Sequence, residues 1–268
     1  MHPWLFHFGT LAVPTYGVLT AAALLAALGM GVAEARRAGL AAEKVWNLGL
    51  VAILAALFGS RLLLVAAHWS TFREHPFWLL GLATVHGAWI ALGGAAIGCA
   101  AAVLYALAEG LPLLRVADAA APGAALGFAV NQVGAFCGGM GWGTRTALPW
   151  GVTYRSAVAY LWYRTPLGVP LHPVQLYDAA GSLAILAVLV GMQRQGFARR
   201  AGELAGAWLF LYGVCRFFLE FLRGDAAGAR ILGGALTLAQ GLALLAVVAG
   251  CALWLRRGSL KAATAPTT

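Results

Sequence analysis

Residues 46–67 read WNLGLVAILAALFGSRLLLVAA, with Arg61 as the single charged side chain. A helix that crosses the hydrocarbon core of a bilayer needs roughly 20 mostly apolar residues, and this stretch has that length. Six other stretches share this character: 12–33, 85–107, 118–138, 173–193, 203–222 and 231–255. The sequence therefore predicts an all-α polytopic membrane protein, with about seven transmembrane helices in one domain over residues 1–260.

The composition supports this class of protein. Hydrophobic residues make up 62% of the 268 positions and charged residues only 10%, whereas soluble domains average about 45–50% and 25%. The net charge of +9 would suggest nucleic acid as the partner of a soluble protein. In so apolar a chain, basic residues are better interpreted as markers of membrane orientation, so the expected partner is the lipid bilayer and not nucleic acid.

Four segments lie outside the seven predicted spans or flank them. Residues 77–84 are apolar but too short to cross alone, which makes them a candidate re-entrant segment. Residues 139–172 form a long loop, and 261–268 have the composition of a disordered tail. Residues 1–6 lack the basic region of a cleavable signal, so we expect the first apolar segment to be retained as a span.

The cysteines give no sign of a metal or disulfide site. They are Cys99, Cys137, Cys215 and Cys251, all inside or beside apolar runs, without a CxxC pair. Buried thiols of this kind usually act as small hydrophobic side chains. They therefore give no evidence for a zinc site or a disulfide framework.

The basic residues predict an orientation. If the N-terminus lies outside, ten Lys and Arg residues fall on the inner side, six fall outside, and Arg61 and Arg216 lie within spans, which accounts for all 18. Basic residues in short loops favour the cytoplasmic side, so the prediction is N-terminus out and C-terminus in. The long loop then faces outwards, and its aromatic residues are expected to form an interfacial belt: Trp142, Trp150, Tyr154, Tyr160, Trp162 and Tyr163.

Polar side chains inside spans are costly in lipid and are functional candidates by default. Here they are Arg61, His86, Arg216 and Glu220, accompanied by Tyr16, Gln132 and Tyr212. In the predicted topology they fall in the outer half of the bilayer, with Tyr212 somewhat deeper. Scattered structural polar residues would not be expected to share a depth, so the pattern predicts one site.

The sixth predicted span adds a spacing argument. Tyr212, Arg216 and Glu220 recur every four positions and therefore lie on one face of a helix. Arg216 and Glu220 alone would fit an internal ion pair that lets both charges persist in lipid. The presence of Arg61 and His86 at the same depth favours a site for an anionic group, because arginine suits phosphate.

Several motifs resemble the bacterial prolipoprotein diacylglyceryl transferase family, in the order in which that family carries them. They are Tyr16-Gly17, Gly59-Ser60-Arg61, His86-Gly87, Gly134-x-Phe136, Trp142-x-Thr144, Pro149-Trp150-Gly151-Val152, His172-Pro173-Val174-Gln175-Leu176-Tyr177-Asp178, Tyr212-Gly213-x-x-Arg216-Phe217-x-x-Glu220-Phe221-x-Arg223-Gly224-Asp225 and Leu236-Thr237-Leu238-Ala239-Gln240-Gly241. Each is weak alone. The HPxQLYD and YGxxRFxxEFxRxD stretches together, in a seven-span chain, are specific.

The resemblance implies transfer of a diacylglyceryl group from phosphatidylglycerol to the lipobox cysteine of a prolipoprotein signal peptide in the bacterial cytoplasmic (inner) membrane, with release of glycerol phosphate. It implies that the reaction requires no metal and no redox cofactor. It implies His86, Tyr212 and Arg216 as catalytic residues. Arg216 would hold the phosphate and Glu220 would orient Arg216. Substrate binding would involve Tyr16, Arg61, Gln132, Gly134, Gly143 and Glu220.

One stretch departs from the family it resembles. The family signature is approximately Gly-Arg-x-Gly-Asn-Phe-x-Asn-x-Glu-x-x-Gly, and here Gln132 replaces the Arg, Ala135 the first Asn and Met140 the Glu. Glutamine can hydrogen-bond a phosphate but brings no charge to it. Either Arg61 or Arg145 compensates for the missing cation, or the chain is a paralogue with an altered acceptor or with lipid binding alone. A transporter or channel for a lipid or small anion is a further alternative.

Overall fold

The computed structural model describes residues 4–8, 11–74, 88–197, 200–225 and 230–256. Seven helices in this part of the chain are long and apolar enough to cross a membrane, which confirms the predicted all-α polytopic fold. They are α1 (Thr15–Arg37), α2 (Ala42–Ala67), α4 (Ala88–Ala108), α5 (Leu113–Gly138), α7 (Val174–Arg194), α8 (Glu203–Leu219) and α9 (Leu238–Leu255). The re-entrant candidate 77–84 and the tail 261–268 lie outside the described residues.

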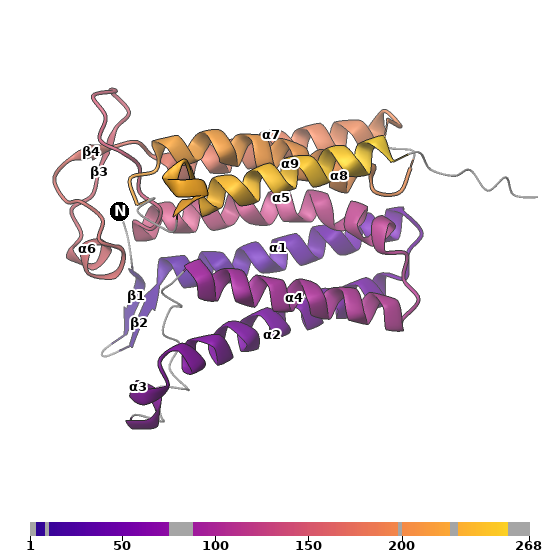
Figure 1. Cartoon of the computed structure of the whole chain (residues 1–268), viewed down its shortest axis with the longest axis horizontal. Helices are drawn as coiled ribbons and strands as arrows, with labels where there is room; N and C mark the ends of the chain where they lie inside the picture. Colours follow the sequence, from indigo (N-terminus) through magenta and orange to yellow (C-terminus); the bar gives the residue numbers. More distant parts are fainter. Residues whose placement is uncertain (1–3, 9–10, 75–87, 198–199, 226–229, 257–268) are drawn as a thin grey trace, which may run out of the picture.

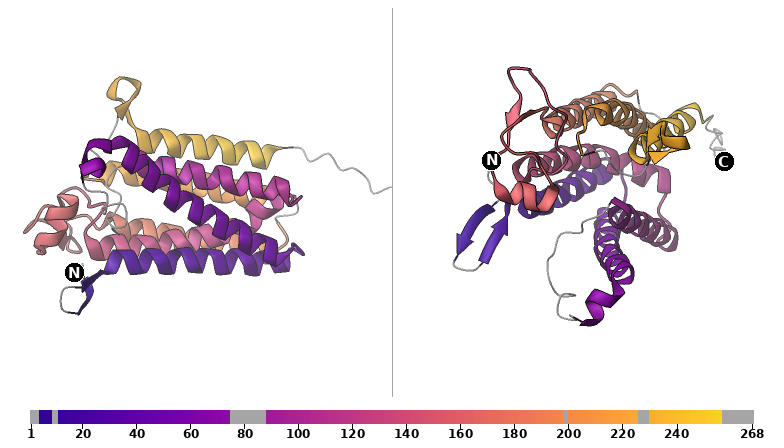
Figure 2. Two further views of the ribbon diagram at one scale, coloured as in Figure 1. Left: turned by 90° about the horizontal axis from the view of Figure 1, so that it is seen from below. Right: turned by 60° about the vertical axis from the view of Figure 1, so that its left-hand side comes forward.

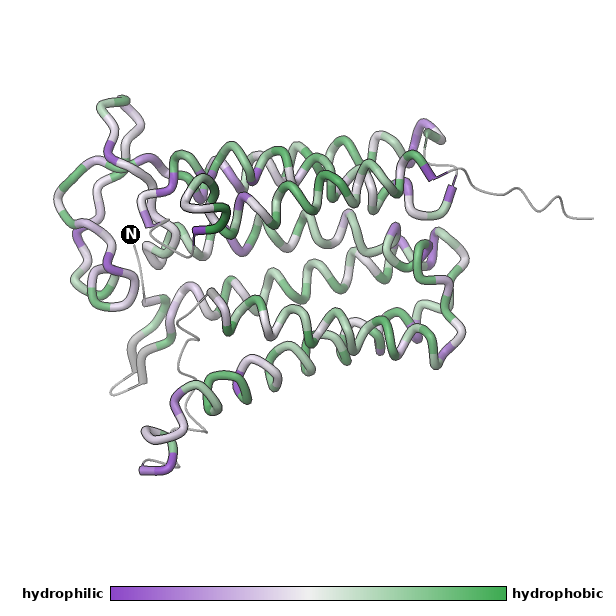
Figure 3. The backbone as a smooth tube through the Cα atoms, in the orientation of Figure 1, coloured by the Kyte–Doolittle hydropathy of each residue, from purple (hydrophilic) through white to green (hydrophobic). Residues whose placement is uncertain are grey.

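The long helices lie side by side, and the short elements gather at one end of the bundle (Figure 1). This end, called the hairpin end below, carries α3 (Trp69–Glu74), α6 (Ala157–Tyr163) and three antiparallel hairpins. The hairpins are β1 (Trp4–Phe8) with β2 (Leu11–Pro14), β3 (Val152–Thr153) with β4 (Pro170–Leu171), and β5 (Arg230–Ile231) with β6 (Leu236–Thr237). Figure 3 shows mostly apolar helix middles, with hydrophilic residues concentrated towards the two ends.

Two predicted spans begin later than their apolar runs. Residues 12–14 belong to β2, and α1 starts only after Pro14, which lies in an extended conformation. Residues 231–237 form β5, the short 3₁₀ helix η3 (Leu232–Gly234) and β6, so α9 starts at Leu238. Gly233 and Gly234 have φ angles of 66° and 97°. A right-handed α-helix needs a negative φ, near about −60°, so α9 cannot extend back through these two residues.

Small residues bring the helices close together. A Cβ on Gly127 of α5 would lie 3.0 Å from the carbonyl oxygen of Ala23 on α1. A Cβ on Gly250 of α9 would lie 2.6 Å from the carbonyl oxygen of Gly206 on α8. Small residues at such crossings let helix backbones approach in a membrane, where lipid gives no hydrophobic drive for association. This explains much of the high glycine content, 35 residues in the whole chain.

The helices form two groups around α1. Helix α5 packs against α1, α7 and α8, and α8 packs against α9. Helices α2 and α4 pair with each other and contact the remaining bundle less extensively, mainly through α1, as the right-hand view of Figure 2 shows. Side chains on α2 therefore lie away from those on α7 and α8.

The segment between α5 and α7 has a small core of its own. Tyr154, Ala159 and Leu171 are buried together, and the Thr165 hydroxyl donates to the Gly139 carbonyl at 2.7 Å. Tyr154 is only 2% exposed, so its expected place in an interfacial aromatic belt is wrong. Its ring closes the interior of this segment, and the segment is a folded cap on the bundle.

Candidate functional site

An ion pair at the end of α8 forms the centre of the candidate site. Arg216 Nη2 donates to Glu220 Oε2 at 2.7 Å, one helical turn along the chain. Glu220 is buried at the start of η2 (Glu220–Leu222), and its Oε1 accepts from the Thr237 hydroxyl at 3.1 Å. Thr237 is also the N-cap of α9 and forms a capping box with Gln240. The start of α9 thus holds the carboxylate that orients Arg216.

A second guanidinium group lies beside the first. Arg223 Nε is 3.8 Å from Glu220 Oε2, and Arg223 donates two hydrogen bonds of 2.8 and 2.7 Å to Asp225. Burial lowers the pKa of Arg223, but the hydrogen bonds to Asp225 and its charge outweigh burial and raise the pKa overall. Arg223 therefore carries full positive charge at the hairpin end.

Gly143 holds the backbone of Arg223 in place. These two residues form an antiparallel bridge, flanked by hydrogen bonds from Thr144 N to Leu222 O at 2.8 Å and from Gly224 N to Trp142 O at 2.9 Å. A Cβ on Gly143 would collide with the His172 carbonyl oxygen on its other side. The glycine lets three backbone segments meet beside the arginines.

A groove of about 570 Å³ runs from these charges along α4, α8 and α9. Its polar end is formed by Arg216, Glu220, Arg223, Asp225 and Thr237, and Tyr212 lies farther along. The rest is largely apolar and is lined by Trp89, Ala91, Leu92, Leu238, Ala239, Leu242, Ala243 and Ala246. This amphiphilic lining suits a molecule with an anionic head and apolar chains.

A second, smaller cavity of about 120 Å³ shares Arg216 and Arg223 with the groove. Gln132, which also lines it, donates through Nε2 to Asp178 Oδ2. Asp178 is 2% exposed. The three residues that depart from the resembled signature, Gln132, Ala135 and Met140, all line this one cavity. All three departures therefore change the lining of the same cavity.

The charges around the two arginines do not balance. Arg216 and Arg223 face three carboxylates, Glu220, Asp178 and Asp225, through hydrogen bonds or electrostatic contact. The cluster has a formal charge of −1 before an anion binds. The cation that the resembled signature carries at position 132 would face Asp178, and here a neutral amide occupies that place.

Other predicted site residues lie at varying distances from this cluster. Tyr212 lines the groove, with its ring stacked on Trp208 at a centroid distance of 5.7 Å. Gly134 belongs to the α1–α5 contact, where an added Cβ would lie 3.5 Å from the Tyr16 ring. Neither Gly134 nor Tyr16 lines the groove or the small cavity in the described part of the chain.

The structure does not bring Arg61 to the cluster. Its guanidinium lies over the Phe72 ring, 5.8 Å from the centroid, on the α2–α3 side. It is absent from the linings of the groove and the small cavity, as far as the described residues show. His86 falls outside the described residues. Arg223, and not Arg61, is the second cation beside Arg216.

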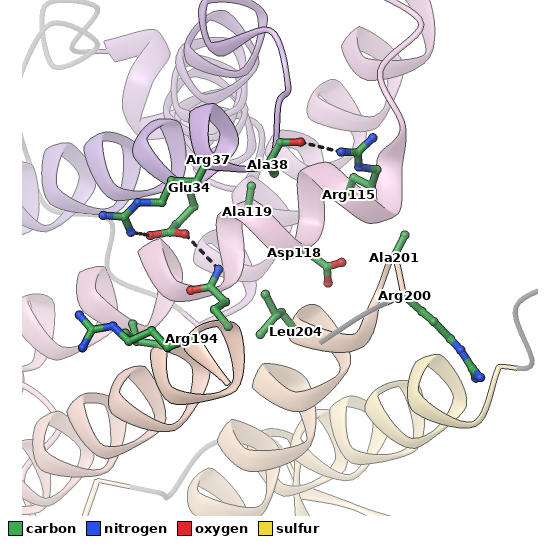
Figure 4. Close-up of a pocket in the computed structure, with 12 residues that line it drawn as sticks. Glu34, Arg37, Ala38, Arg115, Asp118, Ala119, Arg194, Arg200, Ala201 and Leu204 are labelled. Atoms are coloured by element: carbon green, nitrogen blue, oxygen red, sulfur yellow. Dashed lines mark hydrogen bonds and ion pairs between the residues drawn. The ribbon is translucent and has the colours of Figure 1, made fainter. Parts of the chain in front are cut away.

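Another pocket, of about 680 Å³, lies at the opposite end of the bundle between α1, α5, α7 and α8 (Figure 4). Four arginines line it, but their guanidinium groups point in different directions, and Arg37 pairs with Glu34. Asp118 accepts from the backbone of Gly202 and Ala205 at 2.7 and 2.9 Å. The acids serve structural contacts, and the cations do not converge on one point.

Comparison with known proteins decides the family. The family model described as prolipoprotein diacylglyceryl transferase matches residues 3–256. The chain belongs to the prolipoprotein diacylglyceryl transferase family. Among its relatives, the phosphatidylglycerol–prolipoprotein diacylglyceryl transferase of Synechococcus elongatus is 30% identical over 92% of this chain and 84% of the relative. That of Gloeobacter violaceus is 30% identical over 97% and 94%, and that of Clostridium tetani 28% over 85% and 88%.

Several side chains in the site of this diacylglyceryl transferase family member are not among the residues expected from the sequence. Asp178, Gln175 and Arg223 line the small cavity, and Thr237 holds Glu220. The HPxQLYD, YGxxRFxxEFxRxD and LTLAQG stretches contained them, so the signal was present. Their proximity to one another could not be predicted, because α5, α7, α8 and α9 meet only in the folded bundle.

Proposed function

We propose that this protein transfers the diacylglyceryl group of phosphatidylglycerol to the lipobox cysteine thiol of a prolipoprotein. The amphiphilic groove carries the proposal most directly, because two arginines stand at its polar end and apolar side chains line its length. A phospholipid has the same division, with an anionic phosphate and apolar acyl chains. Family membership supplies the reaction type, and the groove supplies a place for the lipid.

The reaction is a substitution at carbon. The cysteine sulfur forms a bond with the terminal glyceryl carbon of the diacylglyceryl group, and the bond from that carbon to the phosphate oxygen breaks. The oxygen keeps the electron pair and leaves as glycerol phosphate, and the thiol proton passes to a base. A thiolate is the better nucleophile, and fixed donors lower the barrier by stabilising charge on the leaving phosphate.

The residue roles follow this chemistry. Arg216 and Arg223 hold the phosphate, and Glu220 orients Arg216. Tyr212 and His86 assist proton handling. Gly143 acts through the backbone that carries Arg223, while Gly134 and Tyr16 shape the neighbouring α1–α5 wall. Gln132 contributes to substrate binding through its hydrogen bond to Asp178, and Arg61 contributes positive charge from a distance.

The site is proposed to lie in the outer half of the bacterial cytoplasmic membrane, with the N-terminus outside. Basic residues support this orientation. Arg36, Arg37, Arg115, Arg194 and Arg200 lie at the opposite end of the bundle, at helix ends or connections, as expected for a cytoplasmic face. The hairpin end then meets the signal peptide of a prolipoprotein as it emerges on the outer side.

A reconstituted assay tests the function. The purified chain is mixed with phosphatidylglycerol and a lipobox peptide, and the thioether product is measured by mass spectrometry. Product is expected from the wild type and is expected to fall by at least a hundredfold in Arg216→Ala and in His86→Ala. Arg194→Ala, an exposed arginine at the opposite end, is the matched control and should retain activity. No product from folded wild-type protein would contradict the proposal.

Complementation separates transfer from lipid binding alone. A bacterium depleted of its own transferase is supplied with the wild-type chain or with Gln132→Arg. Growth with the wild type is expected, since Arg216 and Arg223 already provide two cations. If cells grow with the Gln132→Arg variant but not with the wild-type chain, the natural chain is a non-catalytic member.

A further inference from the structure

Two spaces of different character meet at the same pair of arginines. Arg216 and Arg223 line both the long groove and the 120 Å³ cavity enclosed by α5, the segment after it, and α7. A phosphodiester bound by these arginines has two substituents. One can extend along the apolar groove, and the other can enter the small polar cavity.

The small cavity offers hydrogen-bond acceptors without partners. Asp178 Oδ1 and Gln175 Oε1 are buried and accept no hydrogen bond from the described residues. Both residues line the cavity and are 2% exposed. Their other polar atoms are engaged, since Asp178 Oδ2 accepts from Gln132, and Gln175 Nε2 donates to Met140 O at 2.8 Å and to the Tyr154 hydroxyl at 3.2 Å. Buried acceptors of this kind call for a donor.

The chemistry of the cavity selects its occupant. Two acceptors match two hydroxyl donors, and a volume of about 120 Å³ exceeds the roughly 10–15 Å³ that one water needs on this measure. A three-carbon polyol therefore has room. An ammonium group is disfavoured, because it would lie against Arg216 and Arg223, which already interact electrostatically with Asp178.

We propose that this cavity is the headgroup subsite, in which Asp178 Oδ1 and Gln175 Oε1 accept hydrogen bonds from the two glycerol hydroxyls of phosphatidylglycerol. The inference rests on the proposed function for the identity of the lipid. Asp178 and Gln175 are then the residues that select the headgroup, while the arginines recognise any phosphodiester. Gln132 contributes by engaging only one oxygen of Asp178 and leaving the other for the ligand.

The test compares two lipids that differ only in these hydroxyls. Phosphatidylpropanol has the charge and chain length of phosphatidylglycerol but no headgroup hydroxyl. Binding of each lipid is measured by native mass spectrometry, and kcat/KM for transfer is measured with each as donor. The wild type is expected to prefer phosphatidylglycerol by about tenfold or more, as for a hydrogen bond to a charged acceptor.

The variants decide whether the cavity is responsible. Asp178→Asn should reduce the preference about tenfold, with phosphatidylpropanol binding unchanged or tighter because one negative charge is gone. Ala135→Val fills the cavity without altering a polar group and should also reduce the preference. Asp118→Asn makes the same chemical change at the opposite end of the bundle and should leave the preference unchanged. A merely structural defect would weaken both lipids alike.

Failure of the inference and failure of the function give different results. If wild-type protein binds the two lipids equally, or if Asp178→Asn and Ala135→Val both keep the wild-type preference, the headgroup subsite is wrong even where transfer occurs. If no transfer occurs but the binding preference is present and lost in Asp178→Asn, the subsite stands and the transferase proposal fails.

Discussion

The Thr237 hydroxyl donates to Glu220 Oε1 at 3.1 Å, joining the start of α9 to the carboxylate that holds Arg216. The same hydroxyl oxygen accepts from Gln240 N at 3.1 Å and caps α9. One side chain thus serves both helix initiation and the position of the candidate phosphate-binding arginine. A change at Thr237 should affect stability and transfer together.

Thr237→Ala is expected to lower the free energy of unfolding by about 1 kcal/mol through loss of the N-cap, and to raise KM for phosphatidylglycerol because Glu220 loses a partner. Thr237→Ser keeps the hydroxyl and should restore both quantities. Thermal unfolding in detergent and transfer kinetics measure them. If the serine variant behaves like the alanine variant, the hydroxyl has neither role.

Glu220→Gln should weaken transfer by about tenfold to a hundredfold, because Arg216 loses its charged partner and its fixed orientation. The free energy of unfolding should fall by about 1–3 kcal/mol, as expected for a buried charged hydrogen bond. Glu109→Gln is the control, since Glu109 pairs with Lys44 at 2.9 Å where both are partly exposed. That change should cost no more than about 1 kcal/mol. Equal losses in the two variants would contradict the assigned role of Glu220.

Gly143→Ala is expected to reduce transfer strongly, because the new Cβ would collide with the His172 carbonyl oxygen and lie 2.7 Å from Val174 Cγ2. The strand pairing that carries Arg223 would shift. Gly191→Ala on α7 is the control, since nothing lies within 4 Å of its added Cβ. It should be neutral or stabilise the helix by up to about 1 kcal/mol. Transfer at the wild-type rate in Gly143→Ala would show that the bridge is dispensable.

Alkaline pH should destabilise the cap between α5 and α7 through Tyr154. Burial raises the pKa of Tyr154 to about 12, despite the opposing hydrogen bond from Gln175. The phenol ionises at lower pH when unfolded, so its contribution to stability is complete below about pH 10 and is lost as pH rises towards 12. Tyr154→Phe should flatten this fall, whereas Tyr160→Phe, on the exposed surface of α6, should not. The free energy of unfolding is measured as a function of pH, with phenolate absorbance as the signal. If Tyr154→Phe shows the same fall in stability as the wild type, Tyr154 is not its cause.

The membrane fold could be predicted from sequence because lipid imposes a local rule. Each span must satisfy the hydrogen bonds of its own backbone and present enough apolar length. Stretches such as 46–67 can therefore be recognised from their composition and length. Boundaries were less accurate at residues 12–14 and 231–237, where apolar composition is equally compatible with a hairpin. The i, i+4 spacing of Arg216 and Glu220 also predicted their ion pair correctly, since helix geometry is local.

The composition of the site depended on the tertiary structure. Arg61 and Arg216 are both arginines in apolar spans, yet the pairing of α2 with α4 takes Arg61 to the Phe72 side, while a backbone bridge from Gly143 places Arg223 beside Arg216. Asp178 acquires its acceptor role only because α5, α7 and α8 enclose a cavity around it. Apolar length and helical spacing are properties of consecutive residues, so both can be derived from the amino-acid sequence. Which charges meet depends on contacts between distant segments, so it follows from the packing of the bundle.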